Sequence, residues 1–124
     1  MNKLSDEKLK KKYEDLHNNF IKGDFKKVIK GCNKVLEKRK NQLFFNLLCI
    51  AYQKIGKIEK SIDVMNEALT FNPNHPDFLN NLGLCFYMLH KFSEAEKYFK
   101  KGLEIDNKHL HILNNLGNLK RETF

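Results

Sequence analysis

Apolar residues recur every three or four positions through most of the chain, and short polar breakers interrupt them. One stripe runs from Leu9 to Phe20, and a second runs from Val28 to Leu36 after a turn at Gly23. Spacing of i, i+3, i+4 and i+7 places apolar side chains on one face of an α-helix. Short links between such helices make neighbours antiparallel. The pattern predicts seven helices, at about residues 6–22, 25–38, 42–55, 58–71, 76–89, 92–105 and 109–123.

Residues that favour helix starts support three of these boundaries. Ser5 stands before two acidic residues, which suits an N-cap and the positive end of a helix dipole. Ser93 is followed three positions later by Glu96, which matches the capping-box pattern. Pro76 suits the first turn of a helix, where a backbone N–H has no helical partner in any case. We therefore expect side-chain caps at Ser5 and Ser93 and a helix start at Pro76.

The chain matches itself when it is shifted by 34 residues. Residues 42–75 then align with residues 76–109, and the opening of a further unit follows from Leu110. A fixed period of roughly 20 to 50 residues indicates a repeat architecture in which each unit packs on its neighbours. The coincident positions are Phe45, Leu79 and Leu113; Leu48, Leu82 and Leu116; Cys49, Gly83 and Gly117; Tyr52 and Phe86; Ser61 and Ala95; Met65 and Phe99; Ala68 and Gly102; and Pro73 and Asn107.

This order of residues resembles the tetratricopeptide repeat family. The family pattern is a large apolar residue, a leucine–small pair and an aromatic residue, then small, aromatic and small residues and a closing proline. The resemblance covers roughly residues 8–124, but tryptophan is missing, Asn107 replaces the proline and Gly102 stands where alanine is usual. The positions that carry the pattern, and that we expect to pack between helices, are Leu48, Cys49, Tyr52, Ala68, Pro73, Leu82, Gly83, Phe86, Ala95, Phe99, Gly102, Leu116 and Gly117.

The resemblance implies an all-α fold, a right-handed α-solenoid of antiparallel helix hairpins with three repeats and a C-terminal helix. The first repeat is the weakest match, because it is one residue short and Leu16 stands where a small residue is expected. We expect one domain over residues 1–124, with repeats at about 8–41, 42–75 and 76–109 and a partial repeat or capping helix at 110–124.

Small residues allow the two helices of one repeat to approach closely. We expect Gly83 to face Ala95, and Cys49 to face Ser61, at the helix crossings. The final helix carries the same packing pattern at its own leucine–glycine pair, residues 116–117, without a second helix to cover it. A terminal unit normally presents a polar outer face. We therefore expect either a longer parent chain or self-association through the C-terminal helix.

Stacked hairpins leave a concave surface lined by the first helix of every repeat. In the tetratricopeptide arm of O-linked N-acetylglucosamine transferase, an asparagine just before the repeat leucine grips peptide backbones, and Asn81 and Asn115 match that place whereas Leu47 does not. A carboxamide donates and accepts, so it can pair with a peptide unit. The alternative is that these asparagines are merely solvated, since asparagine is common in this chain. The candidate groove residues are Asn46, Asn80, Asn81, Asn114 and Asn115, with Tyr87 and Met88 as apolar anchors.

A second binding mode of the family is a basic clamp for a C-terminal carboxylate, as in chaperone adaptors. The clamp needs lysine and asparagine on the first groove helix, asparagine on the second and basic residues on the third. The corresponding places hold Tyr13 and His17, then Leu47, then Asp77 and Asn81. The sequence therefore argues against an adaptor for chaperone tails.

The net charge of +8 is concentrated near the N-terminus. Residues 1–41 carry 13 Lys and Arg against 6 Asp and Glu, whereas residues 42–124 carry 10 against 9. Such a basic region can attract RNA or another acidic surface, although AT-rich coding also favours lysine. Proteins that bind nucleic acid usually contact it through arginine guanidinium groups. Only Arg39 and Arg121 are present, so nucleic acid is an unfavoured partner. The lysines concerned are Lys10, Lys11, Lys12, Lys26, Lys27, Lys30, Lys34, Lys38 and Lys40.

No constellation for catalysis or metal binding stands out. Cys32, Cys49 and Cys85 lie widely spaced within apolar stripes, which indicates core thiols in a reducing compartment. His109 and His111, like His75, lie at turns between units without a set of ligands at metal spacing. We therefore expect no metal, no cofactor and no enzymatic activity.

These observations favour a scaffold that binds a protein or peptide in its concave groove. One alternative is a basic module for RNA or an acidic surface, and another is the helical arm of a larger enzyme, such as a glycosyltransferase or sulfotransferase. No apolar run approaches the about 20 residues of a membrane-spanning helix, and the first 12 residues do not resemble a secretory signal. We expect a cytoplasmic location.

Overall fold

A computed structural model describes residues 5–123, and its regular elements over that range are all α-helices. The prediction of an all-α fold is confirmed, and each predicted boundary lies within one residue of the observed one. The helices are α1 (Asp6–Ile21), α2 (Phe25–Lys38), α3 (Gln42–Lys54), α4 (Ile58–Phe71), α5 (Pro76–Met88), α6 (Phe92–Ile105) and α7 (Leu110–Thr123).

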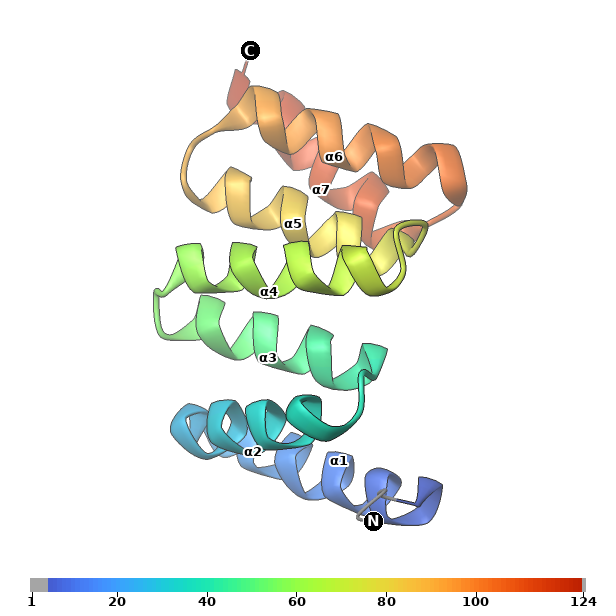
Figure 1. The fold of residues 1–124 in the computed structure, drawn as a ribbon. Helices are drawn as coiled ribbons and strands as arrows, with labels where there is room; N and C mark the ends of the chain where they lie inside the picture. The colour runs from blue at the N-terminus through green and yellow to red at the C-terminus, as the bar shows by residue number, and fades with distance from the viewer. Residues whose placement is uncertain (1–4, 124) are drawn as a thin grey trace.

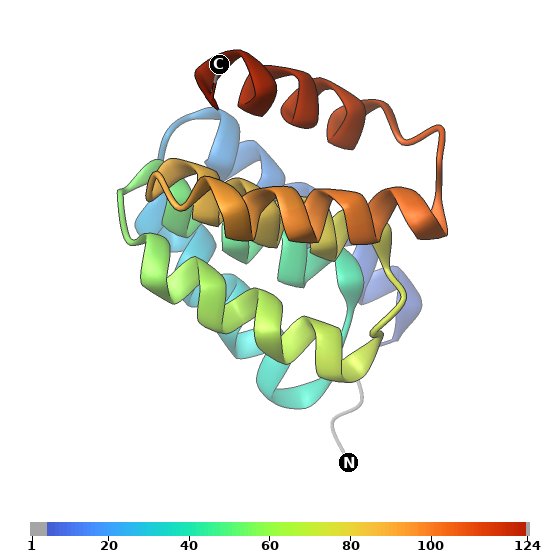
Figure 2. The same ribbon diagram turned by 90° about the horizontal axis from the view of Figure 1, so that it is seen from above.

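The helices stack in chain order as hairpins, from α1 and α2 at one end to α6 and α7 at the other (Figure 1). Each helix packs on the next one in sequence, and the first helices of successive repeats also touch, α1 on α3, α3 on α5 and α5 on α7. Seen along the stack, α7 lies at its edge with α6 beside it (Figure 2). The arrangement is a helical-repeat solenoid in which α1, α3, α5 and α7 share one side.

The core runs along the stack as two clusters, both of which contact Phe86, because every helix turns its apolar stripe inward. Val28, Phe45 and Phe78 are completely buried in the larger part of the core, and Phe99 and Ile112 are completely buried where α6 and α7 meet. Burial of a large apolar side chain contributes about 1.5–3 kcal/mol. The repeat pattern is therefore chiefly a pattern of core positions.

Close approach of helices explains the small residues of the repeat. The backbone oxygen of Cys49 accepts a hydrogen bond from the Ser61 hydroxyl at 2.8 Å, so these two residues meet as expected. A Cβ on Gly83 would lie 2.6 Å from a ring carbon of Phe99, which means that the aromatic ring, rather than Ala95, is its nearest neighbour. Gly83 is thus the position where the ring of α6 rests on the backbone of α5.

The turn inside each hairpin contains one residue with a left-handed backbone. This residue is Gly23 (φ 81°), Gly56 (φ 80°) and, unexpectedly, His90 (φ 60°). The turn also sets where the following helix begins. α6 starts at Phe92 with Lys91 as its N-cap residue and no side-chain cap.

The predicted caps are therefore only partly correct. The Ser5 oxygen accepts a hydrogen bond from the N–H of Lys8 at 3.2 Å, and Pro76 opens α5, both as predicted. The capping box at Ser93 is wrong, because the turn through His90 already places Ser93 inside the first turn of α6.

Candidate functional site

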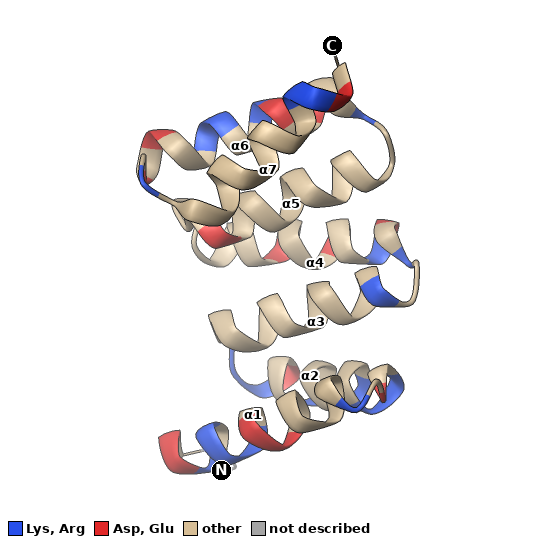
Figure 3. Ribbon diagram, turned by 180° about the vertical axis from the view of Figure 1, so that it is seen from behind, with Lys and Arg blue, Asp and Glu red and all other residues tan. Residues whose placement is uncertain are grey.

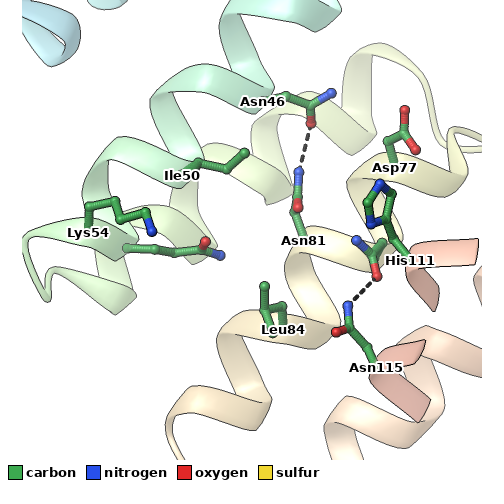
Figure 4. Close-up of a pocket in the computed structure, with 10 residues that line it drawn as sticks. Asn46, Ile50, Lys54, Asp77, Asn81, Leu84, His111 and Asn115 are labelled. Carbon is green, nitrogen blue, oxygen red and sulfur yellow. Dashed lines mark hydrogen bonds between the residues drawn. The ribbon is translucent and has the colours of Figure 1, made fainter. Parts of the chain in front are cut away.

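A groove of about 460 Å³ opens on the side shared by the first helices of the repeats. Figure 4 shows its walls, which come from α3, α5 and α7, three helices that are separate in sequence. The lining residues are Asn46, Ile50, Gln53 and Lys54 from α3, Asp77, Asn80, Asn81 and Leu84 from α5, and His111 and Asn115 from α7.

Two pairs of asparagines connect these helices across the groove. The amide nitrogen of Asn81 donates to the side-chain oxygen of Asn46 at 2.9 Å, and that of Asn115 donates to the oxygen of Asn80 at 2.8 Å (Figure 4). Both bonds join residues 35 apart, so each pair spans one repeat boundary. The 34-residue repeat therefore places two equivalent asparagine pairs in a row.

Each asparagine pair keeps unused hydrogen-bonding capacity. Asn80 and Asn81 are each only 8% exposed, but a carboxamide has two N–H donors and two acceptor lone pairs. Within the described residues, no hydrogen bond uses the amino group of Asn46 or the oxygen of Asn81. The pairs thus offer a donor and an acceptor to a ligand while they hold the repeats together.

The other candidate groove residues lie elsewhere. Asn114 is exposed on α7 and does not line the groove. The ring of Tyr87 lies 5.6 Å from that of Phe92 and packs on the α6–α7 part of the core. Met88 is 42% exposed, beyond the groove lining. The expected placement of Tyr87 and Met88 as apolar groove anchors is not what the structure shows, and Ile50 and Leu84 supply the apolar walls instead.

The groove has opposite charges at its two ends. Lys54 is the cation at one end, and it forms no ion pair among the described residues. At the other end the carboxylate of Asp77 accepts a hydrogen bond from Nε2 of His109 at 2.5 Å. Nδ1 of His109 accepts from the N–H of Ile112 at 3.3 Å, so the ring proton is on Nε2 and the ring is held toward Asp77.

Two thiols lie directly behind the groove. The amide of Gln53 donates to the sulfur of Cys85 at 3.2 Å and approaches that of Cys49 at 3.7 Å. The hydrogen bond between the two thiols, together with burial, raises the pKa of Cys49. Burial alone raises the pKa of Cys32 to about 12. All three cysteines are free and buried, as expected for core thiols.

The histidines at the turns, His75 and His109, form hydrogen bonds to the start of the first helix of their own repeat. Nε2 of His75 donates to the side-chain oxygen of Gln42 at 2.7 Å, and its ring stacks on Phe78 with 4.2 Å between ring centres. Nδ1 of His75 is buried and has no hydrogen-bond partner among the described residues. Over residues 5–123 no group of three or more His, Cys, Asp or Glu is arranged to hold a metal ion.

A second cavity, of about 450 Å³, lies between α1 and the start of α3. Its walls include Tyr13, whose ring meets that of Phe44 edge-on at 5.7 Å, and Leu43, which is 48% exposed. Tyr13 stands at one of the places where the basic clamp needs a lysine. This cavity therefore combines apolar and aromatic walls with the polar residues Asp6, Lys10, Glu14 and Asn41.

Lysines gather at the α1–α2 end of the molecule, which we call the basic end, although those of α1 lie among equally many Asp and Glu (Figure 3). Lys11 pairs with Asp15 at 3.2 Å, and Lys40, just after α2, pairs with Glu67 at 2.8 Å. Surface pairs of this kind contribute about 0–1 kcal/mol each. In the described part of the chain, no helix is long and apolar enough to cross a membrane.

Solved helical-repeat domains share this fold. The first tetratricopeptide domain of Spaghetti (RPAP3), solved with an HSP90 peptide, superposes with a TM-score of 0.83 at 19% identity, covering 97% of this chain and 96% of that one. The Yersinia enterocolitica secretion chaperone SycD, solved with a peptide of the translocator YopD, gives a TM-score of 0.83 at 17% identity, covering 99% and 100%.

Sequence comparisons point to the same family. The chain is 28% identical over 89 residues to the heat shock protein STI1 of Saccharomyces cerevisiae, which is 70% of this chain but only 15% of the yeast protein. Models described as tetratricopeptide repeat match residues 42–75 and residues 76–109, which together make up more than half of the chain. The chain belongs to the tetratricopeptide repeat family.

Proposed function

We propose that the chain is a scaffold that binds an extended segment of another polypeptide in the groove of α3, α5 and α7. The row of asparagine pairs carries this proposal, because it repeats a donor and an acceptor at the spacing of the helices. An extended peptide presents the same two groups along its backbone. Spaghetti (RPAP3) and SycD, which share the fold, were solved with peptides and thereby support the proposal.

The walls of the groove indicate the character of the bound segment. Ile50 and Leu84 favour an apolar side chain between the asparagine pairs. Lys54 favours an acidic residue at its end of the groove, and Asp77 disfavours one at the other end. Because Asp77 occupies a place where the basic clamp needs a cation, we propose an internal segment rather than an acidic C-terminal tail.

The role we propose is binding without catalysis, in a reducing compartment such as the cytoplasm. Three free, buried thiols fit such a compartment.

The experiment measures the affinity of the protein for each of a set of short synthetic peptides of unrelated sequence. These peptides share a backbone but not their side chains, so a loss common to all of them indicates backbone recognition. We expect the double variant Asn81→Ala plus Asn115→Ala to weaken binding of the whole set about tenfold, as expected for the loss of backbone hydrogen bonds. Asn114→Ala is the matched control, because Asn114 is exposed and lies off the groove. Lys54→Ala should weaken only peptides with an acidic residue.

Circular dichroism and urea unfolding of each variant separate lost binding from lost fold. Unchanged affinity of a folded double variant would remove the basis of the proposal. Equal losses in the double variant and in Asn114→Ala would also contradict it.

The basic end supports a second candidate, the attraction of an acidic macromolecule. Lys26, Lys30 and Lys34 are exposed on α2 and form no ion pair among the described residues. Binding of an RNA oligonucleotide that disappears near physiological salt would reveal nonspecific attraction only. Binding that persists there and is lost in Lys26→Glu plus Lys30→Glu would favour this candidate.

A further inference from the structure

The groove between α3, α5 and α7 carries one charge of each sign. Among the described residues that line it, Lys54 is the only Lys or Arg and Asp77 is the only Asp or Glu. Lys54 stands in the last turn of α3, whereas Asp77 stands in the first turn of α5. Figure 4 shows the two side chains well apart, with the pair of Asn46 and Asn81 between them. The groove therefore has a positive and a negative end.

Neither charge is neutralised within the described part of the chain. Lys54 is exposed and forms no ion pair there. The carboxylate of Asp77 is half exposed, and the described group that bonds to it is the ring of His109. That ring donates from Nε2 and accepts at Nδ1 from the N–H of Ile112. An imidazole that accepts at one nitrogen is neutral, so the negative charge of Asp77 remains available to a ligand.

The hydrogen bond between the repeats gives the spacing of the two charges. Because Asn81 bonds to Asn46, these residues lie at about the same height on the parallel helices α5 and α3. Lys54 is eight residues beyond Asn46, and Asp77 is four residues before Asn81. Twelve helical residues at about 1.5 Å each correspond to about 18 Å along the helix axes. About five residues of extended chain, at about 3.3 Å each, span this distance.

Charges this far apart act on a ligand separately. At physiological ionic strength, screening weakens interactions between exposed charges beyond about 8 Å, which is less than half of the separation. Apolar walls lie between the two charges, since Ile50 is one turn before Lys54 on α3 and Leu84 is two turns after Asp77 on α5. Along the groove, a ligand therefore meets a negative site, an apolar site and a positive site.

We infer that the groove selects an extended segment with a charge of opposite sign at each end. A Lys or Arg of the segment pairs with Asp77, and an Asp or Glu about five positions away pairs with Lys54. An apolar residue about three positions from the basic one packs between Ile50 and Leu84. This inference rests on the proposed function, because it names the segment that the same groove binds. The asparagine pairs contact the backbone of the segment, and the two charges select its sequence.

The test uses three hexapeptides with blocked termini and alanine at the unspecified positions. The matched peptide carries lysine first, leucine fourth and glutamate sixth. The adjacent peptide has the same composition but carries lysine first and glutamate second, so its charges reach only one of the two sites. The uncharged peptide has glutamine in place of both charged residues of the matched peptide.

Isothermal titration at physiological ionic strength measures the affinities. The matched peptide should bind about tenfold more tightly than the uncharged peptide, which corresponds to about threefold for each partly exposed ion pair. It should bind about threefold more tightly than the adjacent peptide, because that peptide forms one of the two pairs.

Charge changes on the protein identify the two positions. Lys54→Glu should weaken the matched peptide about tenfold, since an attraction becomes a repulsion, and should favour a peptide with lysine at both ends. Lys60→Glu is the matched control, because Lys60 is exposed on α4 and lies off the groove. Asp77→Asn should weaken the matched peptide about threefold, and Asp63→Asn on α4 is its control. Circular dichroism checks that every variant is folded.

The outcomes separate this inference from the groove proposal. Equal affinities of the matched and uncharged peptides would overturn the charge pattern, and the groove proposal would stand if Asn81→Ala plus Asn115→Ala weakened both. A preference that depends on Lys54 and Asp77 but not on the asparagines would support the charge pattern and contradict backbone recognition.

The control variants decide whether position matters. A preference that Lys60→Glu reduces as much as Lys54→Glu would reveal attraction by net charge and would overturn the inference. Failure of all three peptides to bind the folded protein would overturn the inference and the groove proposal together.

Discussion

The side chain of Asn81 donates a hydrogen bond to the side chain of Asn46, 2.9 Å away on the preceding repeat. Asn115 and Asn80 repeat this relationship one unit further along the chain. The bond joins two parallel-stacked first helices at the wall of the groove, so the same residues contribute to the stacking of repeats and to the candidate binding surface.

Asn46→Ala removes the acceptor of this bond and leaves a donor on Asn81, which is 8% exposed. We expect the free energy of unfolding to fall by about 1 kcal/mol, since a nearly buried donor loses its partner. Urea unfolding followed by circular dichroism measures the change. Asn114→Ala, on the exposed side of α7, should leave stability within about 0.5 kcal/mol, and an equal loss in both variants would contradict the prediction.

Gly83→Ala should destabilise the protein because its new Cβ would lie 2.6 Å from the completely buried ring of Phe99. Overpacking costs about 1–3 kcal/mol, which exceeds the gain of about 1 kcal/mol from replacing a helical glycine by alanine. Gly117→Ala is the matched substitution with nothing within 4 Å. It should therefore raise the free energy of unfolding, and thermal or urea unfolding of the two variants should show opposite signs.

His90→Gly should stabilise the protein. His90 adopts φ 60°, and the equivalent hairpin turns use glycine at φ 81° and φ 80°. A left-handed backbone costs a non-glycine residue about 1–2 kcal/mol, part of which is offset by the greater freedom of glycine in the unfolded chain. Urea unfolding should show a gain of up to about 1 kcal/mol.

Gly56→Ala is the reverse test in the equivalent turn between α3 and α4. Its Cβ would meet nothing within 4 Å, so a loss of stability would come from the backbone at φ 80° and not from a clash. If Gly56→Ala and His90→Gly both changed stability in the same direction, the left-handed conformation would not be the cause.

Stability should fall as the pH rises above about 9, in part because of Cys32. Burial raises the pKa of this thiol from 9.0 to about 12 in the folded protein. Between these values the unfolded thiol loses its proton while the folded one keeps it, so the unfolded state binds fewer protons and gains in relative stability. The contribution of Cys32 to the free energy of unfolding is present in full below pH 9. Above pH 9 it declines by about 1.4 kcal/mol per pH unit.

Cys32→Ala tests this effect, because it removes the buried thiol and, with it, the electrostatic contribution of Cys32 to the raised pKa of Tyr13. Urea unfolding between pH 8 and pH 11 should give a smaller slope for Cys32→Ala than for the unchanged chain. Identical slopes would show that Cys32 ionises alike in the folded and unfolded states.

The helices and the candidate groove were largely predictable, whereas the contacts between helices were not. The period of the apolar stripes located all seven helices within one residue, because each helix must bury one face. The same period placed Asn81 and Asn115 on the groove side. Tyr87 was misplaced, because neither its helix nor its spacing reveals that the ring packs against Phe92 across a hairpin. The left-handed His90 was also missed, since a glycine normally marks such a turn.

The sequence alone determined the repeat, the family and the side of each helix that is buried, because these depend on the order of apolar and small residues along one chain. Only the tertiary structure decided that Asn81 pairs with Asn46, that Phe99 rests on Gly83 and that Gly117 has no such cover. These contacts depend on the distance and rotation between helices that are about one repeat apart. That geometry is set by the packing of the whole stack, and local periodicity carries no information about it.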